Sequence, residues 1–216
     1  MLVAIDGPAG TGKSTIAEML TQKLQGKDGS PFTYINSGNL YRAITYGCLE
    51  TGVKMDDQEA ILAYAKAAKL EYLDGKLYLD GKMVENLLRS DKIEQHVSPV
   101  SAIVPIRHVV NEHIRKIAEG INAVVEGRDM TTVVFPRSKY RFFLDASIKE
   151  RAKRRYEQGI SSLSLADIEL AIAERDSMDR NKPEGSLYLG EGVQYLDTSD
   201  LTINQVCDTL LKRIQE

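Results

Sequence analysis

The stretch GPAGTGKST, residues 7–15, decides the fold of this chain. It follows a short apolar run, Leu2 to Ile5, and precedes a segment whose apolar residues have helical spacing. Its spacing, G-x4-G-K-[ST], matches the P-loop pattern residue for residue. In such a loop successive backbone N–H groups surround a chain of phosphates, and glycines are needed because the backbone takes positive φ angles. We therefore expect a phosphate-binding site at this strand-to-helix turn.

The loop predicts a role for each of its polar residues. Lys13 is expected to reach the β- and γ-phosphate oxygens, and the Ser14 hydroxyl is the expected ligand of Mg²⁺. The positive end of the helix that follows points at the same anion. A glycine-rich turn without a ligand is the alternative, and the flanking strand and helix disfavour it. The expected nucleotide-binding residues are Gly7, Pro8, Ala9, Gly10, Thr11, Gly12, Lys13, Ser14 and Thr15.

The composition is that of an ordinary globular chain of 216 residues, with 43% hydrophobic and 27% charged residues. A formal net charge of -3 argues against general nucleic-acid binding, which requires many cations. The two cysteines, Cys48 and Cys207, form no C-x-x-C pair, which favours a reducing compartment. No apolar run approaches the length of a membrane span, and the chain enters a strand at once instead of a signal peptide. We expect a cytoplasmic monomer that binds neither nucleic acid nor membrane.

Short apolar runs alternate with segments of helical period along most of the chain. Runs that are apolar throughout are typical of strands buried on both faces, and their alternation with helices indicates a parallel sheet. We therefore predict a three-layer α/β P-loop NTPase fold with a five-stranded parallel sheet. The expected strands are Leu2 to Ile5, Thr33 to Ile35, Ala123 to Glu126, Tyr140 to Leu144 and Gln194 to Leu196.

One region breaks this alternation. Residues 70–85 read LEYLDGKLYLDGKMVE, in which Asp-Gly pairs separate short segments of alternating polarity. Asp-Gly in that setting is a strong hairpin signal. We predict a small antiparallel insert from about Leu70 towards Val97, and a surface decoration without function is the alternative. The whole chain is expected to be one domain, with its core in residues 1–36 and 105–216 and a monophosphate-binding region in about 37–104.

Several helix ends are legible. Ser147 with Glu150 and Thr202 with Gln205 fit the capping box, and glycines at 120 and 159 stand where helices end. An apolar face is expected on the last helix, formed by Ile203, Val206, Leu210 and Ile214.

The loop alone does not separate an enzyme from a nucleotide-sensing switch. Guanine-nucleotide switches carry an Asp-x-x-Gly motif, and the sequence contains none. Residues 181–184, NKPE, resemble the base-binding Asn-Lys-x-Asp motif but end in Glu. A sensing module that binds without transfer remains the alternative from a different class.

Transfer of a phosphoryl group to a second anion requires several arginines, because two polyanions must be brought together. Arg42 and Arg128 each follow a predicted strand, at the carboxyl edge where open α/β folds bind ligands. On the helix beginning near Ser147, Arg151 shares a face with Arg154 or Arg155.

Arg175 and Asp179 are also four residues apart, in the segment ERDSMDRNK. Taken alone, this pair favours an ordinary surface salt bridge. Its position downstream of a P-loop and other arginines makes a functional interpretation the competing one.

With these motifs in this order, the sequence resembles the bacterial cytidylate kinases of the short type, from Met1 to the last helix. The segments that carry the resemblance are IDGPAGTGKST, SGNLYR, the hairpin insert, GRDMTTVVFP, FFLDASIKERAKRR and ERDSMDRNK. Adenylate and shikimate kinases share only the first of them.

The resemblance implies a set of residues for the acceptor nucleotide. Ser98, Arg107 and Asp129 match the set that recognises cytosine, with Ser101 as a rival to Ser98. Such a set offers the donors and acceptors that the base edge requires. The full set of implied substrate contacts is Ser37, Tyr41, Arg42, Ser98, Arg107, Arg128, Asp129, Arg175 and Asp179.

Three positions depart from the family pattern. Lys182 stands where arginine is commoner, which keeps the charge but loses the two-pronged geometry. Glu126 replaces an aspartate before Gly127, and Thr131 replaces a glycine. The sequence offers no physical account of Thr131.

The expected activity is in-line transfer of the γ-phosphoryl group of ATP to CMP or dCMP, with Mg²⁺ and without a covalent intermediate. A lid of about residues 156–164 is expected to close over the site. Transfer to UMP or to a non-nucleotide acceptor is the nearest alternative. The expected catalytic residues are Lys13, Arg128, Arg151, Arg155 and Arg175.

Overall fold

The structure is a computed structural model, and it describes residues 1–26, 28–73, 75–159 and 163–215. The chain divides into two compact units. The phosphate-loop unit comprises Met1–Ile35 and Ile121–Glu216, and the insert unit comprises Asn36–Gly120.

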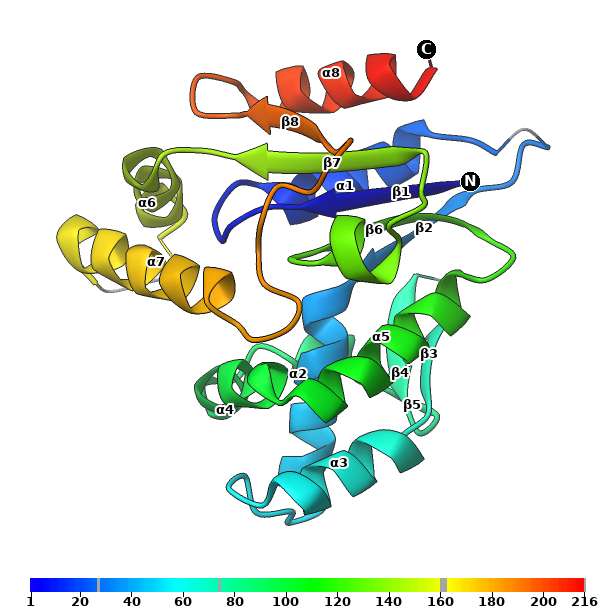
Figure 1. Ribbon diagram of the computed structural model, residues 1–216, viewed down its shortest axis with the longest axis vertical. Coiled ribbons are helices and arrows are strands. Elements are labelled where there is room, and N and C mark those ends of the chain that lie inside the picture. Colours follow the sequence, from blue (N-terminus) through cyan, green and yellow to red (C-terminus); the bar gives the residue numbers. More distant parts are fainter. Residues whose placement is uncertain (27, 74, 160–162, 216) are drawn as a thin grey trace. The chain divides into compact units, whose positions relative to one another are not determined.

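Five strands of the phosphate-loop unit form one sheet in the order β2-β6-β1-β7-β8 (Figure 1). β1 pairs in parallel with β6 and β7, and β7 pairs in parallel with β8. All five expected strands are confirmed, and each is one or two residues longer than predicted. They are β1 (Leu2–Asp6), β2 (Phe32–Asn36), β6 (Asn122–Gly127), β7 (Tyr140–Asp145) and β8 (Gln194–Asp197).

The centre of this sheet is covered on both faces, which explains its continuous apolar runs. Val3, Ala4 and Ile5 of β1 are 0% exposed. Helices α1 (Lys13–Lys23) and α8 (Ile203–Gln215) share one hydrophobic core with Val3 and Ile5. A short helical turn, η2 (Met130–Val134), contacts β1, β6 and β7. The carboxyl ends of β1, β6 and β7 are thereby fixed next to one another.

The expected apolar face of α8 is confirmed at Val206, Leu210 and Ile214, which are buried. It is wrong at Ile203, which is 42% exposed. Ile203 is the first residue of the helix, beyond the reach of the core that buries the later turns.

Two further helices, α6 (Ile148–Glu157) and α7 (Leu165–Arg180), contact each other through a small cluster of Ala152, Ile168 and Ile172. The predicted capping box of Thr202 and Gln205 is confirmed, whereas that of Ser147 and Glu150 forms only its first half, because the Ser147 N–H donates to the Ser199 hydroxyl. The Ser147 hydroxyl accepts from the Glu150 N–H at 3.2 Å, and the Gln205 side chain accepts from the Thr202 N–H at 2.9 Å. The α6 cap fixes the start of the helix that carries the expected arginines.

The insert unit contains the predicted antiparallel sheet, in the order β3-β4-β5. The first Asp-Gly turn includes residue 74, which lies outside the described residues. At the second turn Asp80 and Gly81 have φ angles of 50° and 79°, as a two-residue type I′ turn requires. The strands are β3 (Leu70–Leu73), β4 (Lys76–Leu79) and β5 (Lys82–Met83).

Helices make up the rest of the insert unit. They are α2 (Ser37–Glu50), α3 (Gln58–Ala67), α4 (Asp91–Ala102) and α5 (Val104–Ala118), with a short turn η1 (Glu85–Leu87). The predicted insert ran to about Val97, whereas its strands end at Met83 and α4 follows. The predicted core resumed at residue 105, whereas α5 belongs to the insert unit because it contacts α2, α3, α4 and β3.

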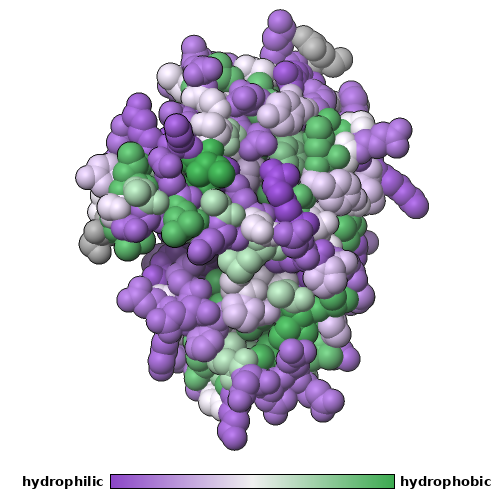
Figure 2. Space-filling view, turned by 60° about the vertical axis from the view of Figure 1, so that its left-hand side comes forward, coloured by the Kyte–Doolittle hydropathy of each residue, from purple (hydrophilic) through white to green (hydrophobic). Residues whose placement is uncertain are grey.

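Most of the surface visible in Figure 2 is hydrophilic, with hydrophobic residues in separate groups. Among the described residues, each helix is either too short or too polar to cross a membrane.

Candidate active site

The phosphate loop leaves β1 in a backbone geometry that only glycine tolerates. Gly7 has a φ angle of 151°, and a Cβ atom at this position would lie 2.0 Å from the carbonyl oxygen of Leu144 in β7. Gly12, the residue before α1, has a φ angle of 85°. Helix α1 begins with neither a side-chain cap nor an acidic residue in its first turn. Its first N–H groups and its positive dipole end are therefore available to an anion.

Lys13 lies buried over this loop. Its ammonium group donates to the Pro8 carbonyl at 2.6 Å and to the Thr11 hydroxyl at 3.4 Å. Burial and the nearby Arg128 guanidinium lower the pKa of Lys13 to about 7, and Arg175 acts in the same direction. Glu126 and Asp6 act in the opposite direction but do not outweigh burial. A bound polyphosphate would favour the charged form of Lys13.

Arg128 is held by a buried carboxylate. Its Nε donates to Asp179 Oδ2 at 2.7 Å, while Lys182 Nζ donates to Asp179 Oδ1 at 2.8 Å. Burial tends to raise the pKa of Asp179, but Arg128 and Lys182 outweigh it and lower the value to about 2. Asp179 is 6% exposed, so the interpretation of Arg175 and Asp179 as a surface pair is wrong. Lys182 therefore has a partner in the structure: together with Arg128, it compensates the charge of Asp179.

Arg151 binds protein groups in this structure. Its guanidinium forms a two-pronged ion pair with Asp176, at 2.6 and 3.1 Å, and donates to the carbonyls of Ala146 and Ala9. The contact with Ala9 ties α6 to the phosphate loop. Arg151 can reach a phosphoryl group only by exchanging these partners, whereas Arg155 is exposed on the last turn of α6.

Asp6, the last residue of β1, is a buried charge that the sequence analysis did not single out. It accepts hydrogen bonds from the segment after Arg128 and Asp129, including one from the Thr131 hydroxyl at 2.6 Å. The hydroxyl of Thr131, which stands where the family pattern has glycine, therefore has a partner in Asp6. In the sequence, the only sign of this role was that Asp6 is a carboxylate at the end of the apolar strand β1. Glu126 accepts from the Tyr34 hydroxyl at 2.6 Å.

In the insert unit, Arg42 of α2 is 8% exposed and binds Glu94 of α4. Its Nε and Nη2 donate to the two carboxylate oxygens at 2.8 and 3.4 Å. Gly38 leaves room for it, because a Cβ atom there would lie 2.9 Å from Arg42 Nη1. Ser37 and Tyr41 are buried on the same helix.

Arg107 of α5 lies beside the two candidate serines of α4. Its Nη1 donates to the Ser101 carbonyl at 2.9 Å, and the Ser101 hydroxyl donates to the Ser98 carbonyl at 2.9 Å. The guanidinium carbon lies 5.7 Å from the centre of the Tyr41 ring. The structure brings Ser98, Ser101, Arg107 and Tyr41 together, and the choice between the two serines stays a prediction.

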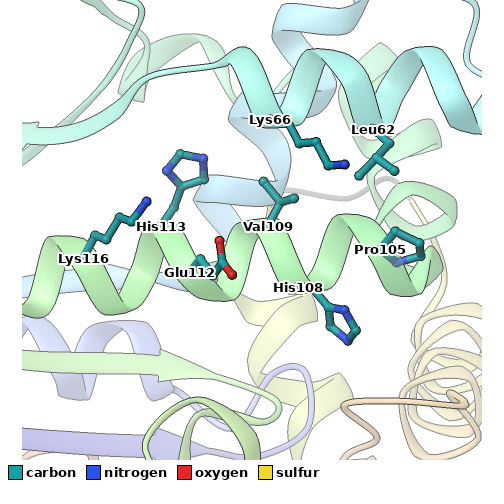
Figure 3. Close-up of a pocket in the computed structure, with 8 residues that line it drawn as sticks. All are labelled: Leu62, Lys66, Pro105, His108, Val109, Glu112, His113 and Lys116. Atoms are coloured by element: carbon teal, nitrogen blue, oxygen red, sulfur yellow. The ribbon is translucent and has the colours of Figure 1, made fainter.

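A separate groove of about 490 Å³ lies between α3 and α5 (Figure 3). Lys66 reaches into it from α3, while Val109 and His113 point towards it from α5. None of the expected site residues lines this groove.

The described residues contain no cluster of three His, Cys, Asp or Glu side chains that could hold a metal ion by themselves. Mg²⁺ in phosphoryl-transfer sites is bound by few protein groups together with substrate phosphates. The exposed Ser14 at the start of α1 fits that mode.

The fold and the site together define a class. A parallel α/β sheet whose β1 runs into a G-x4-G-K-S loop, with Lys13 buried over that loop and Arg128 following β6, is the arrangement of a P-loop kinase.

Comparison with known proteins gives the family. The family model described as cytidylate kinase matches residues 3–216. The cytidylate kinase of Caldanaerobacter subterraneus subsp. tengcongensis is 41% identical over 99% of this chain and 94% of its own length. Cytidylate kinase 1 of Borreliella afzelii is 38% identical over 99% of this chain and 96% of its own length. The chain belongs to the cytidylate kinase family.

A solved structure shares the fold. The crystal structure of an uncharacterised protein from Eubacterium ventriosum aligns with a TM-score of 0.56, covering 100% of this chain and 99% of that one. At 12% sequence identity this match bears on the fold alone.

Proposed function

We propose that this protein is an ATP-dependent (d)CMP kinase that forms CDP or dCDP. An oxygen of the acceptor's 5′-phosphate attacks the γ-phosphorus of ATP, the bond between that phosphorus and the β,γ-bridging oxygen breaks, and ADP leaves. The acceptor is already anionic, so the reaction needs no covalent intermediate and no strong general base. Positioning and charge stabilisation supply the catalysis.

On the donor side, we assign the β- and γ-phosphates to the loop of residues 7–15. Backbone N–H groups at the start of α1 bind phosphate oxygens, and Lys13 turns from the Pro8 carbonyl to the β- and γ-oxygens. Ser14 would hold Mg²⁺, which neutralises phosphate charge when bound. The low pKa of Lys13 supports this assignment, because bound phosphates would favour the charged form that burial and Arg128 disfavour.

On the acceptor side, Arg42 and Arg128 are the proposed ligands of the monophosphate. Each guanidinium holds a carboxylate in this structure, which supports the assignment because phosphate oxygens offer the same kind of anionic partner. Arg175 and Asp179 are assigned to the ribose and phosphate region.

Recognition of cytosine is assigned to Ser98 or Ser101, with Arg107 and Asp129. Arg107 and Asp129 are each 2% exposed, so a base that fails to pair with them would leave costly buried polar groups. The lid of about residues 156–164 stays a prediction, and residues 160–162 lie outside the described residues.

The observation that carries this proposal is the joint presence of the phosphate loop and several buried arginines in a chain of this family. A nucleotide-sensing module would not need Arg42 and Arg107 buried in the insert unit. The buried arginines therefore favour transfer over sensing.

The test is an acceptor panel with Mg·ATP and one of CMP, dCMP, UMP, AMP or shikimate. We expect diphosphate formation with CMP, dCMP or both, at least about 100-fold faster than with the other acceptors. Tight ATP binding without any product would instead identify a sensing module, and a preference for UMP would identify the alternative kinase.

A further inference from the structure

Asp6 is buried where the phosphate loop begins. It is the last residue of β1, it is 0% exposed, and Gly7 follows it directly. A buried carboxylate is costly unless donors surround it. The position of those donors in the chain therefore shows which segment Asp6 holds.

Three donors reach this carboxylate, all from one turn of the chain. The Met130 N–H donates to Oδ1 at 2.9 Å, and the Thr131 N–H donates to Oδ2 at 2.7 Å. The Thr131 hydroxyl, also buried, donates to Oδ2 at 2.6 Å. The first two donors belong to the backbone and are available to any residue but proline, whereas the third depends on the side chain.

This turn follows Arg128 and Asp129. On their other side, β6 ends at Gly127, which lies in register with Asp6 in the sheet. The segment Arg128–Asp129 is therefore held at both ends by the residue that precedes the phosphate loop. A change in the Asp6 contacts would therefore loosen the turn that follows Arg128 and Asp129 on the side of the phosphate loop.

We infer that Asp6 and Thr131 form a positioning pair that fixes Arg128 and Asp129 at a set distance from the phosphate loop. The pair touches no reacting atom and acts through those two residues. This inference rests on the proposed function, because it assigns Arg128 and Asp129 to the acceptor nucleotide.

The charge state of Asp6 agrees with this role. Burial raises the pKa of Asp6 to about 6, although the hydrogen bonds from Thr131 and Met130 lower it, and Asp129 raises it further. At neutral pH the carboxylate is therefore ionised and able to accept all three hydrogen bonds.

The test uses Thr131→Val, which removes the hydroxyl donor and keeps the branched shape. Thr131→Ser restores the donor. The neighbouring Thr132 supplies a matched control, because its buried hydroxyl has no hydrogen-bond partner among the residues that the structure describes. Thr132→Val therefore makes the same chemical change without removing a contact.

In steady-state assays of CDP formation we expect Thr131→Val to raise the KM for CMP about tenfold, as the loss of one charge-assisted hydrogen bond would. The KM for ATP should stay within about twofold, and Thr131→Ser should recover most of the loss. An unchanged KM for CMP, or an equal rise in Thr132→Val, would overturn the inference.

Hydrogen exchange provides a readout that does not depend on activity. In Thr131→Val the amides of Met130 and Thr131 should exchange at least about tenfold faster than in the wild type, while Thr132→Val should leave them unchanged. Unaltered exchange in Thr131→Val would refute the positioning pair even if the enzyme makes CDP. A wild type that makes no CDP would refute the proposed function and leave the exchange result standing.

Discussion

Asp179 in the phosphate-loop unit and Glu94 in the insert unit each bind an arginine that we assign to the acceptor, but in different surroundings. The Asp179 side chain is 9% exposed and also binds Lys182. The Glu94 side chain is 40% exposed. A buried carboxylate that loses its arginine loses part of the compensation for its charge, whereas an exposed one is solvated by water.

The arginines of the two units are therefore held in place to different degrees. In the phosphate-loop unit, Arg128 and Arg151 are fixed by buried carboxylates, so their positions are set before a nucleotide arrives. In the insert unit, we expect Arg42 to exchange Glu94 for a substrate phosphate at low cost, because the Glu94 side chain is exposed. Loss of an arginine should therefore affect stability in the first unit and mainly substrate affinity in the second.

The largest effect is expected for Lys13→Ala in the phosphate-loop unit. The change removes the charge assigned to the β- and γ-oxygens, and loss of one such preorganised group costs about 10³-fold in rate. The measurement is kcat/KM for CDP formation, with circular dichroism to show that the fold is kept. Near-wild-type activity in a folded variant would remove Lys13 from the mechanism.

Arg42→Leu should raise the KM for CMP about 100-fold, because a two-pronged charged contact is lost. Its melting temperature should fall by no more than about 2 °C, since water solvates the remaining Glu94 carboxylate. Steady-state kinetics and thermal melting check the two parts. A large loss of stability together with an unchanged KM would reverse the comparison between the units.

Arg128→Leu should behave differently, because Asp179 would keep only Lys182 as its partner. Breaking a buried pair costs about 3 kcal/mol, which in a chain of this size lowers the melting temperature by about 8 °C. The double variant Arg128→Leu with Asp179→Leu should recover part of that loss without recovering activity. A single variant as stable as the wild type would show that Asp179 needs no arginine.

The smallest predicted signal is an uptake of protons on ATP binding. With its pKa at about 7, Lys13 is mostly neutral at pH 8. Bound phosphates raise the pKa of Lys13, so about one proton should enter per ATP bound. Calorimetry at pH 8 in buffers of different ionisation enthalpy measures this number. Lys13→Arg, whose guanidinium stays charged, is the control, and an enthalpy independent of buffer in the wild type would contradict the expected pKa.

The sequence predicted the parts of the fold that depend on local patterns. The sheet followed from continuous apolar runs such as Leu2 to Ile5, the insert from its Asp80-Gly81 turn, and the start of the last helix from the capping box of Thr202 with Gln205. Each of these patterns involves residues that are close together in the sequence, so it can be recognised without knowing the rest of the fold.

Contacts between distant residues could not be predicted in that way. Asp6 and Thr131 are 125 positions apart, and Arg151 and Asp176 are 25 apart. Spacing on one helix suggested Asp179 as a partner for Arg175, but the fold places Arg128 against Asp179 from another element. The roles of the arginines in catalysis remain predictions, and the arginine variants described above test them.

The most direct test of the account is a ³¹P NMR time course of the purified protein with Mg·ATP and CMP. The account predicts that the CDP and ADP signals grow together in a one-to-one ratio, with no inorganic phosphate above the rate without enzyme. Release of inorganic phosphate without CDP, or no change in either nucleotide, would contradict phosphoryl transfer to cytidine monophosphate.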